Sequence, residues 1–339
     1  MPSDVIYSPA WWIPGGHLQT LWGKLFRRQP PAPTRLERWD TPDGDFIEVH
    51  RLAASRDAPR ILVLHGLEGS VRSHYAQGLL NEAHNRGWAA DLLIFRSCGS
   101  QPNLTRRFYH SGETSDAAFV LDTIARENPK SPLAIAGVSL GGNVLLRLLA
   151  EQAANLPRQL KAAAAVSVPF DLSRSSQRIN RGLSRLYQRF FLGSLRRKAL
   201  EKVGRFPDLA PAGAIAALRT LRDFDNLITG PIHGFRDAED YYRRASSLPA
   251  LHRIKLKTLL LSAADDPMLP PEVLDDVRRV VGSNPSLVLE FQKKGGHAGF
   301  VAGFAPWRPF YYAEYRVGEF FAAQFEAAEY RSLAKQRNA

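Results

Sequence analysis

Cysteine and long apolar runs are nearly absent from this sequence. The single cysteine, Cys98, cannot form an intrachain disulfide, which excludes a disulfide-stabilised secreted domain and any metal site built from several cysteines. The longest nearly apolar runs, residues 162–170 and 259–264, fall well short of the ~20 residues that a helix needs to cross a bilayer. The N-terminus shows no basic stretch followed by an apolar run, so we expect no secretory signal and a cytoplasmic location.

Acidic residues are outnumbered in a chain that otherwise has the composition of a globular protein. The 339 residues are 45% hydrophobic and 23% charged, and 45 Lys and Arg against 33 Asp and Glu give a net charge of +12. Residues 171–206 hold ten basic residues and two acidic ones, which leaves +8 in that segment alone. A charge of this kind fits nucleic acid, an anionic membrane or an acidic substrate. Since no recognition helix, zinc finger or aromatic-basic RNA motif is visible, we expect no nucleic-acid partner.

Short apolar segments alternate with segments of helical spacing along most of the chain. Residues 34–41 and 46–52 flank a Pro-Asp-Gly-Asp turn and predict a β-hairpin. Six buried strands are predicted after it, at residues 61–64, 88–95, 133–136, 162–168, 258–262 and 287–291. Helices are predicted between them at residues 75–86, 114–127, 142–152 and 271–281. This alternation predicts an α/β fold with a mostly parallel central sheet and helices on both faces.

One long interval breaks the alternation and sets the expected domain organisation. Residues 171–250 are helical in character without a convincing strand, which predicts a helical cap or lid inserted into the sheet. The core is then formed by residues 34–170 and 251–330, with a closing helix over about 310–330. Outside the core we expect an N-terminal arm at residues 1–33, anchored by tryptophans, and a frayed tail at residues 331–339.

The pentapeptide Gly137-Val138-Ser139-Leu140-Gly141 matches G-x-S-x-G and lies between a predicted strand and a predicted helix. This strand–turn–helix context is what the motif requires, because small flanking residues let the chain reverse tightly while the serine protrudes. The hydroxyl of Ser139 would then lie near a helix N-terminus, which favours developing negative charge. The motif indicates a nucleophilic serine.

A serine hydroxyl needs a base that is oriented by a carboxylate. Asp265 and Asp266 follow one predicted strand and His297 follows the next, at the same sheet edge from which Ser139 emerges. The order serine, acid, histidine predicts a triad, with either aspartate as the acid at this point. The alternatives are a charged turn that caps the next helix for the aspartates and a loop histidine for His297.

Two backbone N–H groups must stabilise the oxyanion of an acyl-transfer reaction. We assign this role to the amides of Leu67 and Leu140, because the loop after the strand at residues 61–64 and the residue after the nucleophile are where this architecture places them. His65 is expected to hold the loop by hydrogen bonding, and Glu68 to organise it, rather than to act in catalysis. Neither a metal nor a cofactor is expected, since the histidines are dispersed in the sequence and none forms a helical i, i+4 pair.

These motifs together resemble the YheT-like branch of the α/β-hydrolase superfamily, which is related to the α/β-hydrolase-domain lipases. The resemblance covers nearly the whole chain and includes Gly16-His17-Leu18-Gln19-Thr20, His65-Gly66-Leu67-Glu68-Gly69-Ser70, Phe95-Arg96-Ser97-Cys98-Gly99-Ser100, Tyr109-His110-Ser111-Gly112-Glu113-Thr114, Gly137 to Asn143 and Gly295-Gly296-His297. It implies a serine hydrolase of carboxylic esters, carboxylesterase-like or lipase-like, with Ser139, Asp266 and His297 at the triad positions. Asp266 is favoured over Asp265 because its place in the loop resembles the superfamily's acid loop. Ser97 departs from the family's pattern, in which glycine is expected.

Other functions use the same residues. An acyltransferase or thioesterase would pass the same acyl-enzyme to another acceptor, and a catalytically silent hydrolase fold would bind lipid or a protein partner. The sequence favours a small-molecule ester, with lipid esters included, and says nothing of the oligomeric state.

The basic segment itself allows two interpretations. Ile179, Leu183, Leu186 and Phe190 recur at helical spacing among arginines, which predicts a basic amphipathic helix. Its apolar stripe either faces an anionic membrane or covers the active-site cleft, and we favour the second interpretation.

Overall fold

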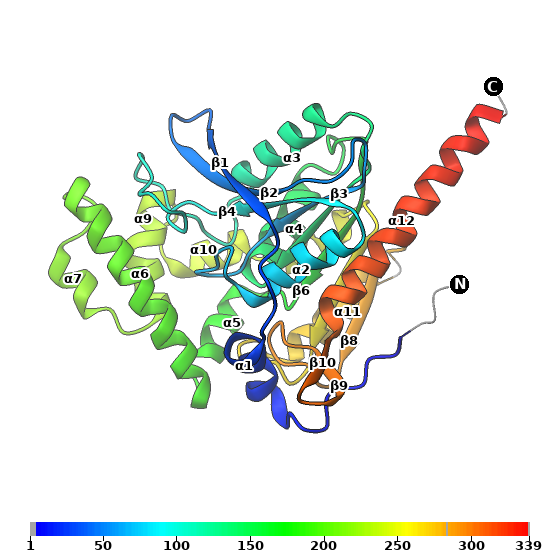
Figure 1. Ribbon diagram of the computed structural model, residues 1–339. Helices are drawn as coiled ribbons and strands as arrows, with labels where there is room; N and C mark the ends of the chain where they lie inside the picture. The colour runs from blue at the N-terminus through cyan, green and yellow to red at the C-terminus, as the bar shows by residue number, and fades with distance from the viewer. Residues whose placement is uncertain (1–4, 283, 338–339) are drawn as a thin grey trace.

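The computed structural model describes residues 5–282 and 284–337 and contains an eight-stranded sheet in the order β1-β2-β4-β3-β5-β6-β7-β8 (Figure 1). β2 runs antiparallel to both of its neighbours, and β4, β3, β5, β6, β7 and β8 are parallel. The hairpin and the six buried strands predicted from the sequence are all present. The strands are β1 (Thr34–Asp40), β2 (Phe46–Leu52), β3 (Arg60–Leu64), β4 (Ala89–Ile94), β5 (Leu133–Val138), β6 (Leu160–Val166), β7 (Thr258–Ala263) and β8 (Leu287–Gln292).

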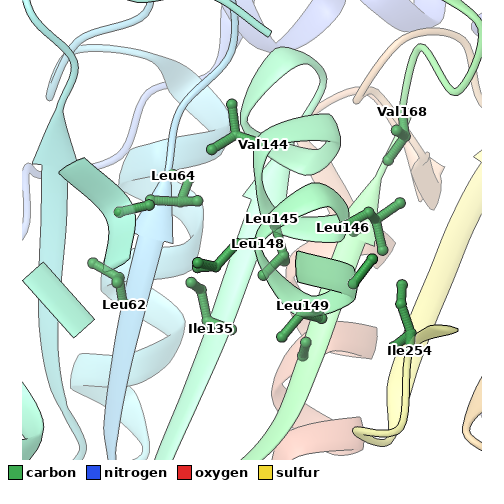
Figure 2. Close-up of a cluster of buried hydrophobic side chains, with 14 of the residues drawn as sticks. Leu62, Leu64, Ile135, Val144, Leu145, Leu146, Leu148, Leu149, Val168 and Ile254 are labelled. Atoms are coloured by element: carbon green, nitrogen blue, oxygen red, sulfur yellow. The ribbon is translucent and has the colours of Figure 1, made fainter. Parts of the chain in front are cut away.

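Helices cover both faces of the sheet, as the alternation predicts. The core helices are α2 (His74–Asn85), α3 (Ser115–Glu127), α4 (Leu140–Glu151), α11 (Glu272–Val281) and α12 (Tyr312–Arg337). Alternate residues of a strand point to opposite faces. In β3, accordingly, Leu62 and Leu64 join the cluster under α3, α4 and α11, whereas Ile61 and Val63 join the one under α2 and α12. Figure 2 shows the first cluster, in which leucines of α4 pack on β3 and β5 and fix the helix that follows Ser139.

The chain between β6 and β7 forms a helical insertion, residues 172–253, at the side of the molecule opposite to α12 (Figure 1). It consists of α5 (Leu172–Ile179), the 3-10 turn η1 (Gly182–Ser184), α6 (Arg185–Arg205), α7 (Ala212–Ala217), α8 (Leu221–Phe224), the π-helical turn η2 (Asp225–Thr229), α9 (Gly230–His233), α10 (Ala238–Ala245) and η3 (Leu248–Arg253).

The single amphipathic helix predicted over residues 179–190 is wrong. The chain leaves α5 at Asn180 and turns at Gly182, which has a positive φ of +49° that favours glycine, before α6 begins. The expected apolar stripe is therefore split. Ile179 is buried, whereas Leu183 and Phe190 are 65% and 58% exposed.

Two features at the ends of the core were not predicted. Helix α1 (Gly15–Phe26) belongs to the N-terminal arm, and β9 (Val301–Ala305) pairs with β10 (Arg308–Tyr311) in a separate hairpin. Trp12 packs edge-on against Trp22 and donates to the Gly303 carbonyl, so these tryptophans do anchor the arm, whereas Trp11 is mostly exposed.

The closing helix α12 is longer than expected. It continues to Arg337 rather than ending near residue 330, because residues 331–337 are rich in helix formers, and the last two residues of the expected tail lie outside the described residues. Within residues 5–282 and 284–337, every helix is too short or too polar to cross a bilayer.

Candidate active site

Ser139 occupies a sharp turn between β5 and α4. Its backbone φ of +56° lies in the left-handed region, a strained conformation for a residue with a side chain. The neighbouring glycines are sterically required. A Cβ on Gly137 would lie 2.4 Å from the Gly141 carbonyl oxygen, and a Cβ on Gly141 would lie 2.4 Å from the carbonyl oxygens of Leu64 and His65. The turn therefore exposes the hydroxyl at the carboxyl edge of the parallel strands.

Loops after β7 and β8 bring an acid and a histidine to this hydroxyl. His297 Nε2 lies 2.8 Å from Ser139 Oγ, and His297 Nδ1 lies 2.7 Å from Asp266 Oδ2. The Asp266 side chain is 1% exposed, and its other oxygen accepts from the Met268 N–H at 2.8 Å. The carboxylate is thus fixed by the backbone and by the imidazole, which orients the second ring nitrogen toward the serine.

The two adjacent aspartates make different contacts in the structure. Asp265 Oδ1 accepts from the Gly296 N–H at 2.9 Å, and Asp265 Oδ2 has no partner among the described residues. Burial, followed by lesser effects that include the nearby Asp266 carboxylate, raises the pKa of Asp265. Asp265 therefore shapes the histidine loop, whereas Asp266 bonds to the imidazole.

The histidine loop is also held by the N-terminal arm, which reasoning from the sequence did not foresee. Gln19 bonds to both the N–H and the carbonyl of Val301, and Thr20 Oγ1 accepts from the His297 N–H at 2.9 Å. Gly16 packs so closely that a Cβ there would lie 1.9 Å from the Asp265 carbonyl oxygen. The motif at residues 16–20 could have signalled this role, because it resembles the family pattern although none of its residues belongs to the predicted triad.

Two different loops carry the amides expected to form the oxyanion hole, with Leu67 after β3 and Leu140 after β5. Leu67 lines the space in front of Ser139, and Leu140 is the first residue of α4, where an N–H has no acceptor within its helix. The His65 side chain is fully buried, contacts the Gly66 carbonyl through Nδ1 at 2.7 Å and accepts from the Phe95 N–H at 3.1 Å through Nε2. Burial lowers the pKa of His65 to about 4. His65 holds the loop, as expected.

Glu68 connects this loop to the helical insertion. Its Oε1 accepts from Lys198 Nζ at 2.8 Å and from the Tyr109 hydroxyl at 2.9 Å, and its Oε2 accepts from the Ser194 hydroxyl. Tyr109 in turn accepts from the Glu68 N–H at 2.7 Å. Since Lys198 and Ser194 belong to α6, one carboxylate ties the insertion to the residue beside Leu67. The sequence indicated a loop organiser but not these partners.

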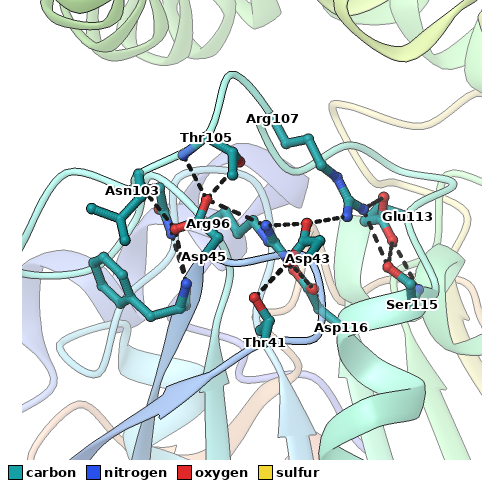
Figure 3. A network of polar contacts seen from close by, with 12 residues as sticks. Thr41, Asp43, Asp45, Arg96, Asn103, Thr105, Arg107, Glu113, Ser115 and Asp116 are labelled. Carbon is teal, nitrogen blue, oxygen red and sulfur yellow. Dashed lines mark hydrogen bonds and ion pairs between the residues drawn. The ribbon is translucent and has the colours of Figure 1, made fainter.

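A buried ionic network supports the loop after β4. The Arg96 guanidinium is 2% exposed and lies among the carboxylates of Asp43, Asp45 and Asp116 (Figure 3). This loop contains Ser97, where the resemblance led us to expect glycine. Ser97 has a φ of +65° and donates its N–H to the Asn103 side chain at 2.6 Å. The left-handed conformation explains the preference for glycine, and the loop forms here with serine.

Two cavities meet at Ser139. One has a volume of about 150 Å³ and extends into the insertion, where its lining is mostly apolar and includes Leu221 and Phe224. At one side it meets Asp225, whose pKa is raised to about 6 by burial. The other is a groove of about 700 Å³ between α1 and the start of α6. Five residues line both spaces, namely Leu67, Ser139, Phe191, Met268 and His297.

The histidines that we treated as dispersed include one close pair. His110 and His233 have ring centroids 4.4 Å apart, and with Glu113 they place three potential metal-ligating atoms within 4.8 Å of one another. His110 Nδ1 accepts from the Gly112 N–H, and Glu113 is hydrogen bonded to Arg107, whereas the buried His233 Nε2 has no hydrogen-bond partner among the described residues. Since His233 belongs to α9 and His110 precedes α3, the pair forms a joint between core and insertion.

Cys98 is a poor candidate for an alternative nucleophile. Its thiol lies 3.3 Å from Lys198 Nζ, yet burial raises the pKa of Cys98 to about 11. A thiol of this kind is mostly protonated at neutral pH and is a weak nucleophile. Its packing role agrees with the interpretation from the sequence.

Comparison with known proteins agrees with this fold. Residues 59–303 match the family model described as alpha/beta hydrolase fold. The chain is 40% identical to "Putative esterase YheT" of Escherichia coli over 92% of this chain and 91% of that one, and 30% identical to a monoacylglycerol lipase of Saccharomyces cerevisiae over 71% and 55%. The solved esterase PF2001 of Pyrococcus furiosus shares the fold, with a TM-score of 0.57 and 17% identity over 88% and 96% of the two chains. The chain belongs to the YheT-like family of α/β hydrolases, a family of the esterase and lipase type.

Proposed function

We propose that this protein hydrolyses carboxylic esters through an acyl-enzyme on Ser139. The observation that carries the proposal is the continuous hydrogen-bonded series from Asp266 through His297 to the serine hydroxyl, with contacts of 2.7 and 2.8 Å. Each contact is within the range in which a proton can be passed or an imidazole oriented. A silent binding fold would have no chemical need for all three groups together.

The mechanism follows from these roles. His297 accepts the proton of Ser139 as the hydroxyl attacks the ester carbonyl carbon, and Asp266 stabilises the resulting imidazolium. The amides of Leu67 and Leu140 bind the oxyanion of the tetrahedral intermediate. His297 then gives its proton to the departing alkoxide, which leaves an acyl-serine. In the second half, His297 activates a water that attacks the acyl carbon, and the proton returns to Ser139 as the acid is released.

The two cavities support a division of the substrate at the scissile bond. We assign the acyl chain to the apolar cavity inside the insertion, because its mostly apolar lining would bury methylene groups. The alcohol part would lie in the groove, which is several times larger and has room for a bulky group. Small-molecule esters, including lipid esters, are the substrates that this arrangement favours, and the names of the esterase and lipase relatives point the same way.

Labelling with a fluorophosphonate probe tests the mechanism directly. Wild-type protein should be labelled and should hydrolyse nitrophenyl esters, whereas Ser139→Ala should do neither while its thermal unfolding midpoint stays nearly unchanged. Hydrolysis by Ser139→Ala equal to wild type would refute the mechanism. Adding competing alcohols and analysing the products separates a hydrolase from an acyltransferase.

A further inference from the structure

Exposed apolar side chains lie on the two elements that border the groove. Five of them, each between 58% and 65% exposed, form what we call the rim, and they are Leu25, Phe26, Leu183, Leu186 and Phe190. The last three belong to η1 and α6 and line the groove, whereas Leu25 and Phe26 belong to α1 and lie outside its lining. Lys24 Nζ lies 3.8 Å from the ring centroid of Phe190 and His17 Nδ1 lies 3.1 Å from the Tyr187 hydroxyl, so the two elements are in contact. Large side chains of this kind are usually covered when they gather around one opening.

The elements that carry the rim are strongly basic. Residues 15–33 contain three basic residues and no acidic one, and residues 172–205 contain ten basic residues and one acidic one, Glu201. Arg181, Arg185 and Arg189 are exposed, and no ion pair involves them among the residues that the structure describes. Elsewhere exposed arginines are commonly paired, as Arg278 is with Asp275. The rim therefore combines apolar side chains with positive charge that the protein itself does not neutralise.

A second exposed apolar group continues this surface. Trp11, Phe304 and Trp307 are 76%, 88% and 80% exposed, and the Trp11 indole donates to the Phe304 carbonyl at 2.9 Å. The β9–β10 hairpin that holds Phe304 and Trp307 contacts α1, and in Figure 1 the hairpin, α1 and the start of α6 lie along the same lower edge of the molecule. Exposed tryptophans are favoured where an apolar layer meets a polar one.

We infer that the rim docks on the surface of an anionic lipid bilayer, with the groove mouth facing the lipid. Apolar side chains that enter the interface and arginines that contact anionic head groups supply two signals, which together give stable peripheral binding. A second copy of this chain fits less well, because the unpaired charges of Arg181, Arg185 and Arg189 would face the same charges on that copy. Nucleic acid would use the charge but not the exposed leucines and phenylalanines.

Docking in this position has a consequence for the reaction. Leu183, Leu186 and Phe190 line the same groove as Ser139, so a lipid ester could pass from the bilayer to the serine without crossing water. This consequence rests on the proposed function, whereas the docking itself does not need a catalytic serine. The two can therefore fail separately.

Co-sedimentation with vesicles tests the docking. Wild-type protein should sediment with vesicles of equal parts phosphatidylcholine and phosphatidylglycerol at low salt, sediment less at high salt, and stay in solution with phosphatidylcholine alone. Ser139→Ala should bind as wild type does, which separates docking from catalysis. Failure of wild-type protein to bind the anionic vesicles at low salt would overturn the inference.

Paired variants locate the surface. R185Q/R189Q should lower partitioning by about 25-fold, at about five-fold for each basic residue removed, and L186S/F190S should lower it by at least as much. R56Q/K130Q removes two exposed basic residues that precede β3 and β5, at the amino ends of the parallel strands, and should leave partitioning within about two-fold of wild type, since the groove lies at the carboxyl ends. Equal losses in R56Q/K130Q and R185Q/R189Q, or unchanged binding by L186S/F190S, would show attraction of net charge only and refute a rim-specific contact.

Discussion

The two walls of the active site are built in different ways. The core wall is made of short loops at the ends of β3, β5, β7 and β8, where Asp266 is 1% exposed and hydrogen bonded through both carboxylate oxygens. The opposite wall, formed by the insertion and α1, is mostly apolar on its inner side and basic on its outer side, where Arg181, Arg185 and Arg189 have no carboxylate partner among the residues described. The difference suggests a division of labour in which the core performs the chemistry and the outer wall selects and receives the substrate.

This division also explains how strictly each wall constrains the sequence. A side chain at Gly137 or Gly141 would clash with backbone atoms, so only a few residue types are allowed in the core wall and its sequence forms short motifs. In the insertion, many apolar side chains could line a cavity equally well, and many arrangements of arginine give a similar electrostatic potential. The insertion can therefore be recognised in the sequence by its composition but not by a motif.

If the core wall performs the chemistry, the largest effect should follow removal of the charge that orients His297. We expect Asp266→Asn to lower kcat by about 10³ to 10⁴-fold, because a neutral amide favours the wrong imidazole tautomer and no longer stabilises the imidazolium. Steady-state hydrolysis of a soluble nitrophenyl ester provides the measurement.

Asp265→Asn is the matched control for that variant. Its side-chain oxygen can still accept from the Gly296 N–H, so we expect kcat within about ten-fold of wild type. The assignment of the acid would be reversed if Asp265→Asn were the more damaging of the two.

The next effect should come from the outer wall and should depend on the substrate. Leu221→Trp places a large ring in the apolar cavity, so we expect hydrolysis of a long-chain ester to fall by about 10 to 100-fold while that of an acetate ester changes by less than about two-fold. Leu200→Trp, on α6 but outside both cavities, is the control and should leave the chain-length profile as in wild type. A uniform loss across all chain lengths would contradict an acyl-chain cavity.

The sequence was sufficient for the parts that depend on local sterics and on strand order. The G-x-S-x-G turn between a strand and a helix, together with Asp266 and His297 after later strands, predicts that three loops share one sheet edge, and the distances between them agree with that placement. The α/β fold, predicted from the alternation of strands and helices, and the YheT-like family, which the motifs resemble, are both confirmed. Choosing between Asp265 and Asp266 needed the family resemblance, since adjacent residues have the same strand context.

The sequence was insufficient where the contact is between distant residues of ordinary type. Nothing in the periodicity of residues 172–200 indicates that Lys198 reaches Glu68, because the path of an irregular insertion depends on its turns. The break near Gly182 was missed for a related reason, since the apolar spacing on both sides continues through it. Thr20 supports His297 from 277 residues away, a separation that no local pattern reports.

The link between the walls should have a smaller effect than either wall. Without the cation at Lys198, the Glu68 carboxylate lacks its charged partner, and the loop that carries Leu67 should shift. We expect Lys198→Met to lower kcat by about five to ten-fold with KM nearly unchanged, since the oxyanion is stabilised only in the transition state. Arg197→Met, the exposed neighbour, should have no such effect.

A double variant tests whether the effect of Lys198 passes through Glu68. If the lone carboxylate is what disturbs the loop, Glu68→Gln combined with Lys198→Met should recover part of the loss in kcat. Additive losses in the double variant would mean that the two residues act independently and would argue against Glu68 as a positioning residue.

The smallest expected effect concerns the joint at which the walls meet, and it depends on pH. Burial is the main cause that lowers the pKa of His110 to about 4 and that of His233 to about 3, from 6.5 for both in the unfolded chain. Below pH 6.5 the unfolded chain therefore takes up protons that these two histidines cannot take up in the folded chain. Their contribution to the free energy of unfolding is fully present above that pH and is lost as the pH falls toward 4.

His233→Phe removes one of these titrating groups. We expect the fall in thermal midpoint between pH 7 and pH 5.5 to be smaller than in wild type by about 2 °C, which corresponds to about 1 kcal/mol for one histidine. The exposed His252, replaced by Gln, should leave the wild-type slope intact, and an unchanged slope in His233→Phe would mean that this joint does not carry the acid sensitivity.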